Sequence, residues 1–165
     1  MKKINCLITG ITGMVGSHLA DFLIKNTNWN IFGLLRWSSK LDNIEHLLEK
    51  INNNKRIFLL YGDLIDHISI REVVKESSPD YIFHLAAETF PKMSFDSPLK
   101  FYDTNIKGTQ ILLEEIKNFK KINPIIHICS SSEVFGKVKK KIFQLMKIAN
   151  FTPPHLTPYQ KWALT

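Results

Sequence analysis

Short apolar runs alternate with amphipathic segments along most of the chain. The runs rich in Ile, Leu and Phe predict buried strands, and apolar positions three and four residues apart predict helices. The predicted strands are residues 4–9, 31–35, 57–61, 81–85 and 125–129, and the predicted helices are residues 14–26, 42–52, 67–77 and 98–119. Strands that alternate with helices form a parallel sheet covered on both faces. We therefore predict an α/β fold, a Rossmann-like doubly wound parallel sheet that is incomplete on its C-terminal side.

The first predicted strand runs directly into three glycines with the spacing G-x-x-G-x-x-G, and then into a helix. In such a turn Gly10 permits a tight bend, Gly13 lets backbone N–H groups approach a diphosphate, and Gly16 lets the helix pack closely. The positive end of the helix dipole then faces the anion. The pattern predicts a dinucleotide site, and its expected cofactor-binding residues are Gly10, Thr12, Gly13, Met14, Val15 and Gly16.

Arg36 directly follows the second predicted strand, 20 residues after Gly16. An acidic residue at this place accepts hydrogen bonds from the ribose 2′-hydroxyl of NAD, whereas an arginine suits the 2′-phosphate of NADP. The alternative interpretation is a solvated arginine in a loop. We predict NADP as the cofactor, with NAD as the second choice.

Composition and charge narrow the class of protein further. Of the 165 residues, 44% are apolar and 22% are charged, as in soluble globular domains. The net charge is +7, but residues 139–165 contain five lysines and no acidic residue, which leaves +2 for residues 1–138. The charge therefore does not indicate a nucleic-acid partner. No apolar run is long enough to cross a bilayer, so we expect no membrane association and a cytoplasmic location.

The cysteines and histidines do not have the spacing of a metal site, and none is predicted. Cys6 and Cys129 both fall in predicted strands, so we interpret them as small buried core residues. His18, His46 and His84 are interpreted as helix-surface or packing residues.

Several short motifs lie near the ends of the predicted strands in an order typical of one family. They are Thr9-Gly10-x-x-Gly13-x-x-Gly16, Gly62-Asp63-Leu64, His84-Leu85-Ala86-Ala87, Asn105-x-x-Gly108-Thr109 and Ser130-Ser131-Ser132-Glu133-Val134-Phe135-Gly136. As a set they resemble the extended short-chain dehydrogenase/reductases, the NAD-dependent epimerase/dehydratase family. Arg36-Trp37-Ser38-Ser39, Asn43-Ile44-Glu45-His46-Leu47 and Ser94-Phe95 resemble the GDP-mannose 4,6-dehydratase branch more narrowly. The resemblance covers residues 1–138, which we expect to form a partial dinucleotide-binding domain.

The resemblance implies roles for residues beyond the glycine-rich turn. Asp63 and Leu64 would flank the adenine, and Asn105 would be a structural residue near the active site. Three residues would line the path toward the nicotinamide, with simple packing at a strand end as the alternative: Leu85, Ala86 and Ala87. The substrate would be a nucleotide sugar. The full-length enzyme from which this sequence derives, called the parent protein below, would be a homo-oligomer.

The resemblance also implies two catalytic residues. Ser131 would be the hydroxyl that hydrogen-bonds the sugar 4-OH, and Glu133 would be the base that takes the C5 proton once a 4-keto group has acidified it. Water would leave from C6, and the hydride taken from C4 would return to C6. The alternative is a loop in which Ser131 and Glu133 cap the next helix. An epimerase, a 4-keto reductase and a non-catalytic dinucleotide-binding protein remain the rival functions.

The catalytic Y-x-x-x-K of the family is absent, because Tyr159 is followed four residues later by Ala163. A shifted reading frame explains the difference. Suppose that the original reading frame begins each codon one base earlier than the frame of this sequence. The codons for His155 to Thr165 can then encode S-P-Y-A-I-S-K-V-G-T-D, which contains Y-x-x-x-K. We therefore expect residues 139–165 to be an out-of-frame tail, caused by the loss of one base near Lys137 to Lys141. We expect no substrate domain in this sequence and no turnover by it. A diverged but selected tail is the alternative.

Overall fold

The computed structural model describes residues 3–48 and 56–130 of the chain. The chain divides into two compact units, Met1–Ile126 and His127–Thr165. The core and the cleft presented below belong to the first unit. Ser131, Glu133 and the whole expected tail lie outside the described residues, so their predicted roles stay predictions.

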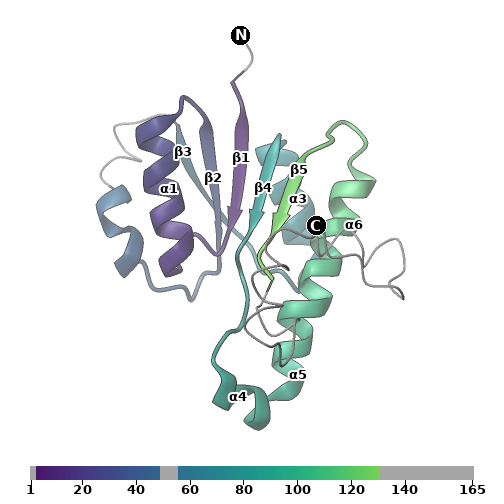
Figure 1. The fold of residues 1–165 in the computed structure, drawn as a ribbon. Coiled ribbons are helices and arrows are strands. Elements are labelled where there is room, and N and C mark those ends of the chain that lie inside the picture. Colours follow the sequence, from purple (N-terminus) through teal and green to yellow (C-terminus); the bar gives the residue numbers. More distant parts are fainter. Residues whose placement is uncertain (1–2, 49–55, 131–165) are drawn as a thin grey trace, which may run out of the picture. The chain divides into compact units, whose positions relative to one another are not determined.

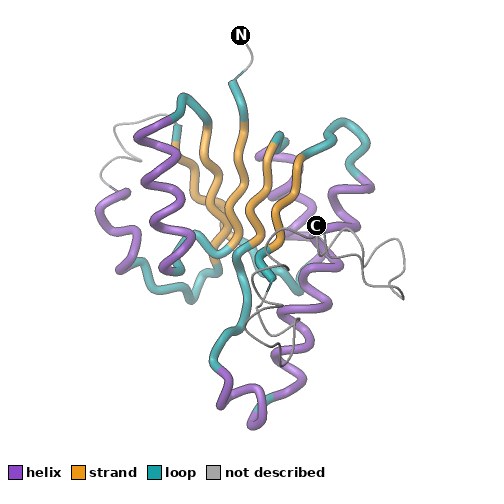
Figure 2. The backbone as a smooth tube through the Cα atoms, in the orientation of Figure 1, coloured by secondary structure: helices purple, strands orange, loops and turns teal. Residues whose placement is uncertain are grey.

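A five-stranded sheet forms the centre of the fold (Figure 2). Its strands are β1 (Asn5–Thr9), β2 (Asn30–Leu35), β3 (Ile57–Tyr61), β4 (Tyr81–His84) and β5 (Ile125–Ile128). The order is β3-β2-β1-β4-β5, and β1 pairs in parallel with both β2 and β4. The chain thus builds the sheet outward from β1, first to one side and then to the other. This arrangement confirms the predicted Rossmann-like doubly wound sheet.

Helices cover the two faces of the sheet. Helix α1 (Met14–Asn26) lies on one face, and α3 (His67–Ser77) and α6 (Gly108–Asn118) lie on the other (Figure 1). Side chains of a strand point alternately to the two faces. Cys6 and Ile8 of β1 therefore pack with α1, while Leu7 packs with α3 and α6. Burial on both faces explains why β1 and β2 are short continuous apolar runs.

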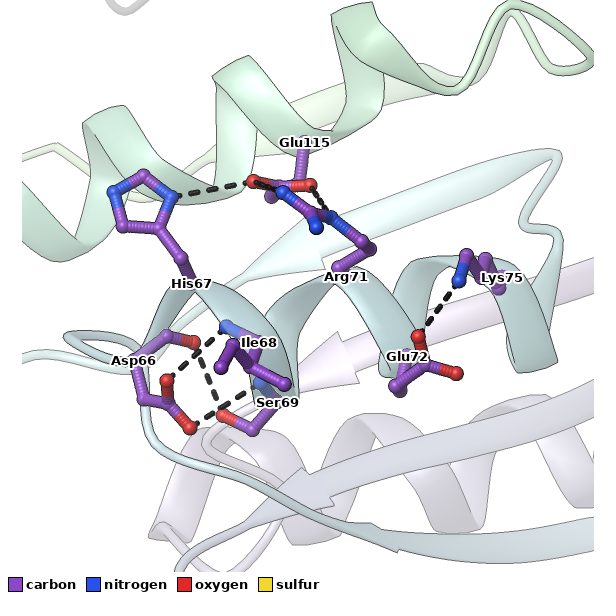
Figure 3. Close-up of polar contacts among 8 residues, drawn as sticks. All are labelled: Asp66, His67, Ile68, Ser69, Arg71, Glu72, Lys75 and Glu115. Carbon is purple, nitrogen blue, oxygen red and sulfur yellow. Dashed lines mark hydrogen bonds and ion pairs between the residues drawn. The ribbon is translucent and has the colours of Figure 1, made fainter.

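Two sets of polar contacts hold α3 in place (Figure 3). The Asp66 carboxylate caps its first turn by accepting the backbone N–H groups of Ile68 and Ser69 at 3.1 and 3.2 Å, and these bonds lower the pKa of Asp66. Glu115 of α6, whose side chain is 4% exposed, accepts Nε of Arg71 at 3.0 Å and Nδ1 of His67 at 3.2 Å. Helices α3 and α6 are therefore joined by a buried carboxylate.

The helical regions differ from the prediction in three places. The expected helix 98–119 is α5 (Pro98–Phe101), then a wider π-helical segment, η2 (Tyr102–Lys107), and then α6. Helix α4 (Pro91–Asp96) was not predicted. The expected helix 42–52 begins as the 3-10 turn η1 (Asp42–Ile44) and continues helically to residue 48, where the described segment ends. A periodic pattern of apolar residues does not distinguish these helix types.

The two cysteines have different environments. Cys6 is fully buried, and burial raises the pKa of its thiol to about 12, so it is an inert core residue as predicted. The prediction for Cys129 is wrong, because this residue is exposed and follows the end of β5. Strand β5 stands last in the strand order, and its residues alternate between exposed and half-buried. An edge strand buries less of its sequence than an inner one.

Candidate functional site

A cleft opens at the carboxyl ends of the inner strands, where the strand order reverses between β1 and β4. Ligands of doubly wound sheets bind at this place. The cleft has a volume of about 190 Å³. It is lined by the last two residues of β2, by residues that follow β1, β2, β3 and β4, and by one residue of η2: Gly10, Thr12, Gly13, Leu34, Leu35, Arg36, Ser39, Gly62, Asp63, Leu64, Leu85, Ala86, Ala87, Glu88 and Thr104.

The floor of the cleft is the glycine-rich turn after β1. Gly10 has a φ of +73°, and a Cβ placed on it would lie 2.9 Å from the backbone of Ala86. A Cβ on Gly16 would collide with the carbonyl oxygen of Gly10. Both positions therefore exclude a side chain: Gly10 because of the bend and the neighbouring chain, Gly16 because α1 starts against the turn. The amide of Asn43 donates to the Thr12 carbonyl at 2.8 Å and steadies the turn from outside.

Helix α1 begins in this turn without a side-chain cap. Its N-cap is Gly13, no side chain accepts a hydrogen bond from its first N–H groups, and its first turn holds no acidic residue. The first N–H groups of a helix need partners, and the positive end of the helix dipole favours an anion. A phosphate group fits these requirements. The turn thus has the form and the charge that the diphosphate of a dinucleotide needs.

A buried hydrogen-bond network joins β1, β4 and α6 beneath the cleft. The Thr9 hydroxyl accepts the N–H groups of Leu85 and Ala86, both at 3.2 Å, so its own proton points to Nδ1 of His84 at 2.8 Å. Nε2 of His84 therefore carries a proton and donates to Thr109 at 2.9 Å. Burial lowers the pKa of His84 to about 4, which keeps the ring neutral. His84 is a packing residue, as predicted.

Asn105 fixes the chain at Glu88, beside the cleft. Its side-chain oxygen accepts the Glu88 N–H at 2.8 Å, and its amide nitrogen donates to the Glu88 carbonyl at 2.9 Å. Thr109 donates to the Asn105 carbonyl at 2.7 Å, which connects this clamp with His84. Asn105 has the structural role that the resemblance implied.

Arg36 stands at the end of β2, on the opposite side of the glycine-rich turn. Its backbone N–H donates to the Ser39 hydroxyl at 3.1 Å, which tightens the loop. Its guanidinium reaches the Glu88 carboxylate at 3.5 Å. The next residue, Trp37, is 82% exposed and stacks on Tyr61 with 4.0 Å between ring centroids. Arg36 thus brings the one cationic side chain among the residues that line the described cleft.

Most of the residues predicted to bind the cofactor come together in this cleft. Those that line it are Gly10, Thr12, Gly13, Arg36, Asp63, Leu64, Leu85, Ala86 and Ala87. Met14 and Val15 are exposed at the start of α1 and do not line it, and Gly16 is buried behind the turn. Their roles in binding a cofactor stay predictions.

The prediction missed six residues that line the cleft: Leu34, Leu35, Ser39, Gly62, Glu88 and Thr104. Five of them precede or follow a predicted residue closely, and their place at a strand end was the available signal. Glu88 directly follows Ala87 in this way. Thr104 comes from η2, and the available signal for it was its neighbour Asn105, which the resemblance placed near the active site.

A parallel sheet wound outward from a central strand, with a glycine-rich turn and a cleft at the reversal, defines a Rossmann-like nucleotide-binding class of fold. The sequence model of one family, GDP-mannose 4,6 dehydratase, matches residues 7–159. The chain belongs to this family, which is part of the epimerase/dehydratase group of NAD(P)-binding proteins. The matched range runs past residue 138, into the segment expected to be out of frame.

Individual proteins of known name or structure also resemble this chain. The GDP-mannose 4,6-dehydratase of Yersinia enterocolitica is 38% identical over 144 residues, which are 85% of this chain and 38% of that protein. The chain thus spans well under half the length of this relative. UDP-glucose 4-epimerase of Thermotoga maritima, solved with UDP-glucose, has a TM-score of 0.57 and 30% identity over 68% of this chain and 33% of that one. The Brucella ovis UDP-glucose 4-epimerase, solved with NAD, shares the fold, with a TM-score of 0.67 and 24% identity over 83% and 38%.

In the described part of the chain no helix is long and apolar enough to cross a membrane. The same residues contain no group of three or more His, Cys, Asp or Glu side chains placed to hold a metal ion.

Proposed function

We propose that the cleft binds NADP, with its diphosphate on the glycine-rich turn and its 2′-phosphate at Arg36. The observation that carries this proposal is the uncapped start of α1 behind Gly10 and Gly13, with no acidic residue in its first turn. Arg36 lies at the end of β2, where the 2′-hydroxyl of NAD or the 2′-phosphate of NADP lies in such folds. When bound, NADP takes up a hydride and returns it. NAD is the alternative cofactor, and it is the one present in the Brucella ovis epimerase structure.

We also propose that the parent protein is a nucleotide-sugar 4,6-dehydratase of the GDP-mannose type. Membership of the family and the presence of Ser131 and Glu133 in its motif support this reaction. Glu133 would hold the proton taken from C5, and Ser131 would hydrogen-bond the 4-hydroxyl. Residues 1–138 would form the cofactor-binding part and residues 139–165 the out-of-frame tail. The 165-residue chain would have no turnover, because it lacks the Y-x-x-x-K tyrosine that takes the C4 hydroxyl proton.

The gene tests both statements. One base restored in the codons for Lys137 to Lys141 should open a frame that contains Y-x-x-x-K and continues beyond codon 165. The longer protein, supplied with NADP, should convert GDP-mannose into a product lighter by one water molecule. The unmodified chain should give no product. A Phe in place of the tyrosine of Y-x-x-x-K, in the longer protein, should remove the activity while leaving cofactor binding intact.

Epimerization is the second candidate reaction, because the Thermotoga maritima epimerase is 30% identical to the chain. The same assay separates the two, since an epimerase changes the sugar configuration without changing its mass. A product of unchanged mass would replace the dehydratase proposal by the epimerase. A frame that closes soon after the restored base would overturn the out-of-frame tail.

A further inference from the structure

Glu88 places a negative charge at the edge of a cleft proposed to bind an anion. Its carboxylate oxygen lies 3.5 Å from Nη1 of Arg36 and 3.4 Å from Nζ of Lys100. Arg36 follows β2 and Glu88 follows β4, and β1 stands between these two strands. The Arg36–Glu88 ion pair therefore reaches across the carboxyl end of β1, where the glycine-rich turn begins. Both residues line the cleft.

The two partners of this ion pair are held unequally. The backbone of Glu88 is bound on both its N–H and its C=O by Asn105, and its side chain is only 19% exposed. The Arg36 side chain is 50% exposed and has its loop, but not its guanidinium, fixed by Ser39. Glu88 is thus the fixed partner, and Arg36 is the one that can turn to another anion.

We propose that Glu88 is a positioning residue that holds Arg36 across the cleft before the cofactor binds and yields it to the 2′-phosphate of the cofactor. This inference rests on the proposed binding of NADP. A phosphate carries more charge than a carboxylate and accepts two parallel hydrogen bonds from a guanidinium, so the exchange favours the phosphate. NAD has no 2′-phosphate to offer Arg36. Glu88 therefore weakens the binding of both dinucleotides, and it reduces the preference for NADP over NAD.

The Glu88→Gln variant tests this role, because Gln keeps the shape of the side chain and removes its charge. We expect its NADPH affinity to rise by about fivefold, near the upper end for a partly exposed ion pair, and its NADH affinity by less than about twofold. Glu72→Gln is the matched control, since Glu72 lies on α3 and pairs with Lys75. The full 165-residue chain and its variants are titrated with NADPH and with NADH by isothermal calorimetry.

A double-mutant cycle shows whether Glu88 acts through Arg36. In an Arg36→Met background the further change Glu88→Gln should alter NADPH affinity by less than about twofold, because the partner is gone. Lys100→Gln, which leaves Glu88 to Arg36 alone, should weaken NADPH binding and gives a second test if Glu88→Gln unfolds. An unchanged or weaker NADPH affinity in Glu88→Gln would overturn the inference, and so would an equal gain for NADPH and NADH. If the unmodified chain binds neither dinucleotide, the proposed function itself fails.

Discussion

His84 is the residue that ties the cleft to the core. It is 4% exposed, and its two ring nitrogens bond to Thr9 and Thr109 on opposite sides. Protonation would force Nδ1 to donate toward the Thr9 hydroxyl, whose lone pairs already accept two backbone N–H groups. Burial and this bonding pattern together keep the imidazole neutral, with its pKa lowered to about 4. The position of Leu85 and Ala86 along the cleft depends on the same hydroxyl.

The lowered pKa of His84 predicts a loss of stability in acid. Below its ordinary value of 6.5 the unfolded chain binds a proton that the folded chain refuses until about pH 4. The free energy of unfolding should therefore fall between pH 6.5 and pH 4, by about 3 kcal/mol from this group. Urea unfolding of the wild type and of His84→Gln across this range measures the effect. The two should converge as the pH falls, and parallel curves would show that His84 does not titrate in this way.

For single residues, the sequence showed which residues lie at the ends of strands, but it did not show which other side chains they contact. Arg36 could be placed at the cleft because it directly follows a strand, and Asp63 because the family resemblance implied its role two residues after β3. Glu88 was missed, because its importance comes from Arg36 and Lys100, which are distant in the sequence and approach it only in the fold. Packing was a sound interpretation for His84, but the two threonines that bind it could not be identified from spacing.

Among the elements, the pair α3 and α6 shows how a buried charge is stabilised. Glu115 is 4% exposed and receives hydrogen bonds from Arg71 and His67 (Figure 3). The hydrogen bonds from Arg71 are the main reason that the pKa of Glu115 lies below its ordinary value. The carboxylate is thus buried and bonded on both oxygens, and it links α6 to α3 next to the apolar contacts of Ile70, Val74 and Leu112.

Removal of the charge at Glu115 should destabilise this helix pair. We expect Glu115→Gln to lower the Tm at pH 7 by about 4 °C, the shift that corresponds to about 1 kcal/mol in a domain of this size. Glu114→Gln, the adjacent residue with a partly exposed side chain paired to Lys117, should change the Tm by less than about 2 °C. Because the folded pKa of Glu115 is lowered, its contribution is present above the ordinary pKa and is lost as the pH falls through the folded value. Equal Tm values for the two variants at pH 7 would contradict this role.

The elements themselves were predicted wherever a single period dominates. All five strands of the described sheet and helices α1 and α3 lie within about one residue of their expected limits. The segment from residue 91 to residue 107 was not resolved into α4, α5 and η2, because Pro91 and Pro98 start new helical turns and the π-helical segment keeps an apolar spacing similar to that of an α-helix. Sequence periodicity contains too little information to find these junctions.

For the whole molecule, the family match and the position of the cleft both indicate an NAD(P)-binding protein of the epimerase/dehydratase group. The reaction that the protein catalyses is a proposal. The chain spans 38% of the Yersinia enterocolitica relative. The family match reaches residue 159, so it includes part of the segment that the codon comparison assigns to another frame. Residues 131–165 lie outside the described structure, and the gene sequence decides between the two interpretations.

The binding of NADP in the cleft is tested most directly by titration of the purified 165-residue chain with NADPH and with NADH. The 2′-phosphate contact at Arg36 should make NADPH the tighter ligand by about tenfold or more, as for a charge-assisted bidentate pair. Arg36→Glu should reverse this preference, because a carboxylate repels the phosphate and accepts from the 2′-hydroxyl. Lys40→Glu, an equal change of charge four residues away and outside the cleft lining, should keep the preference for NADPH. A chain that binds neither nucleotide, or binds both equally before and after the change at Arg36, would contradict a dinucleotide site of this kind.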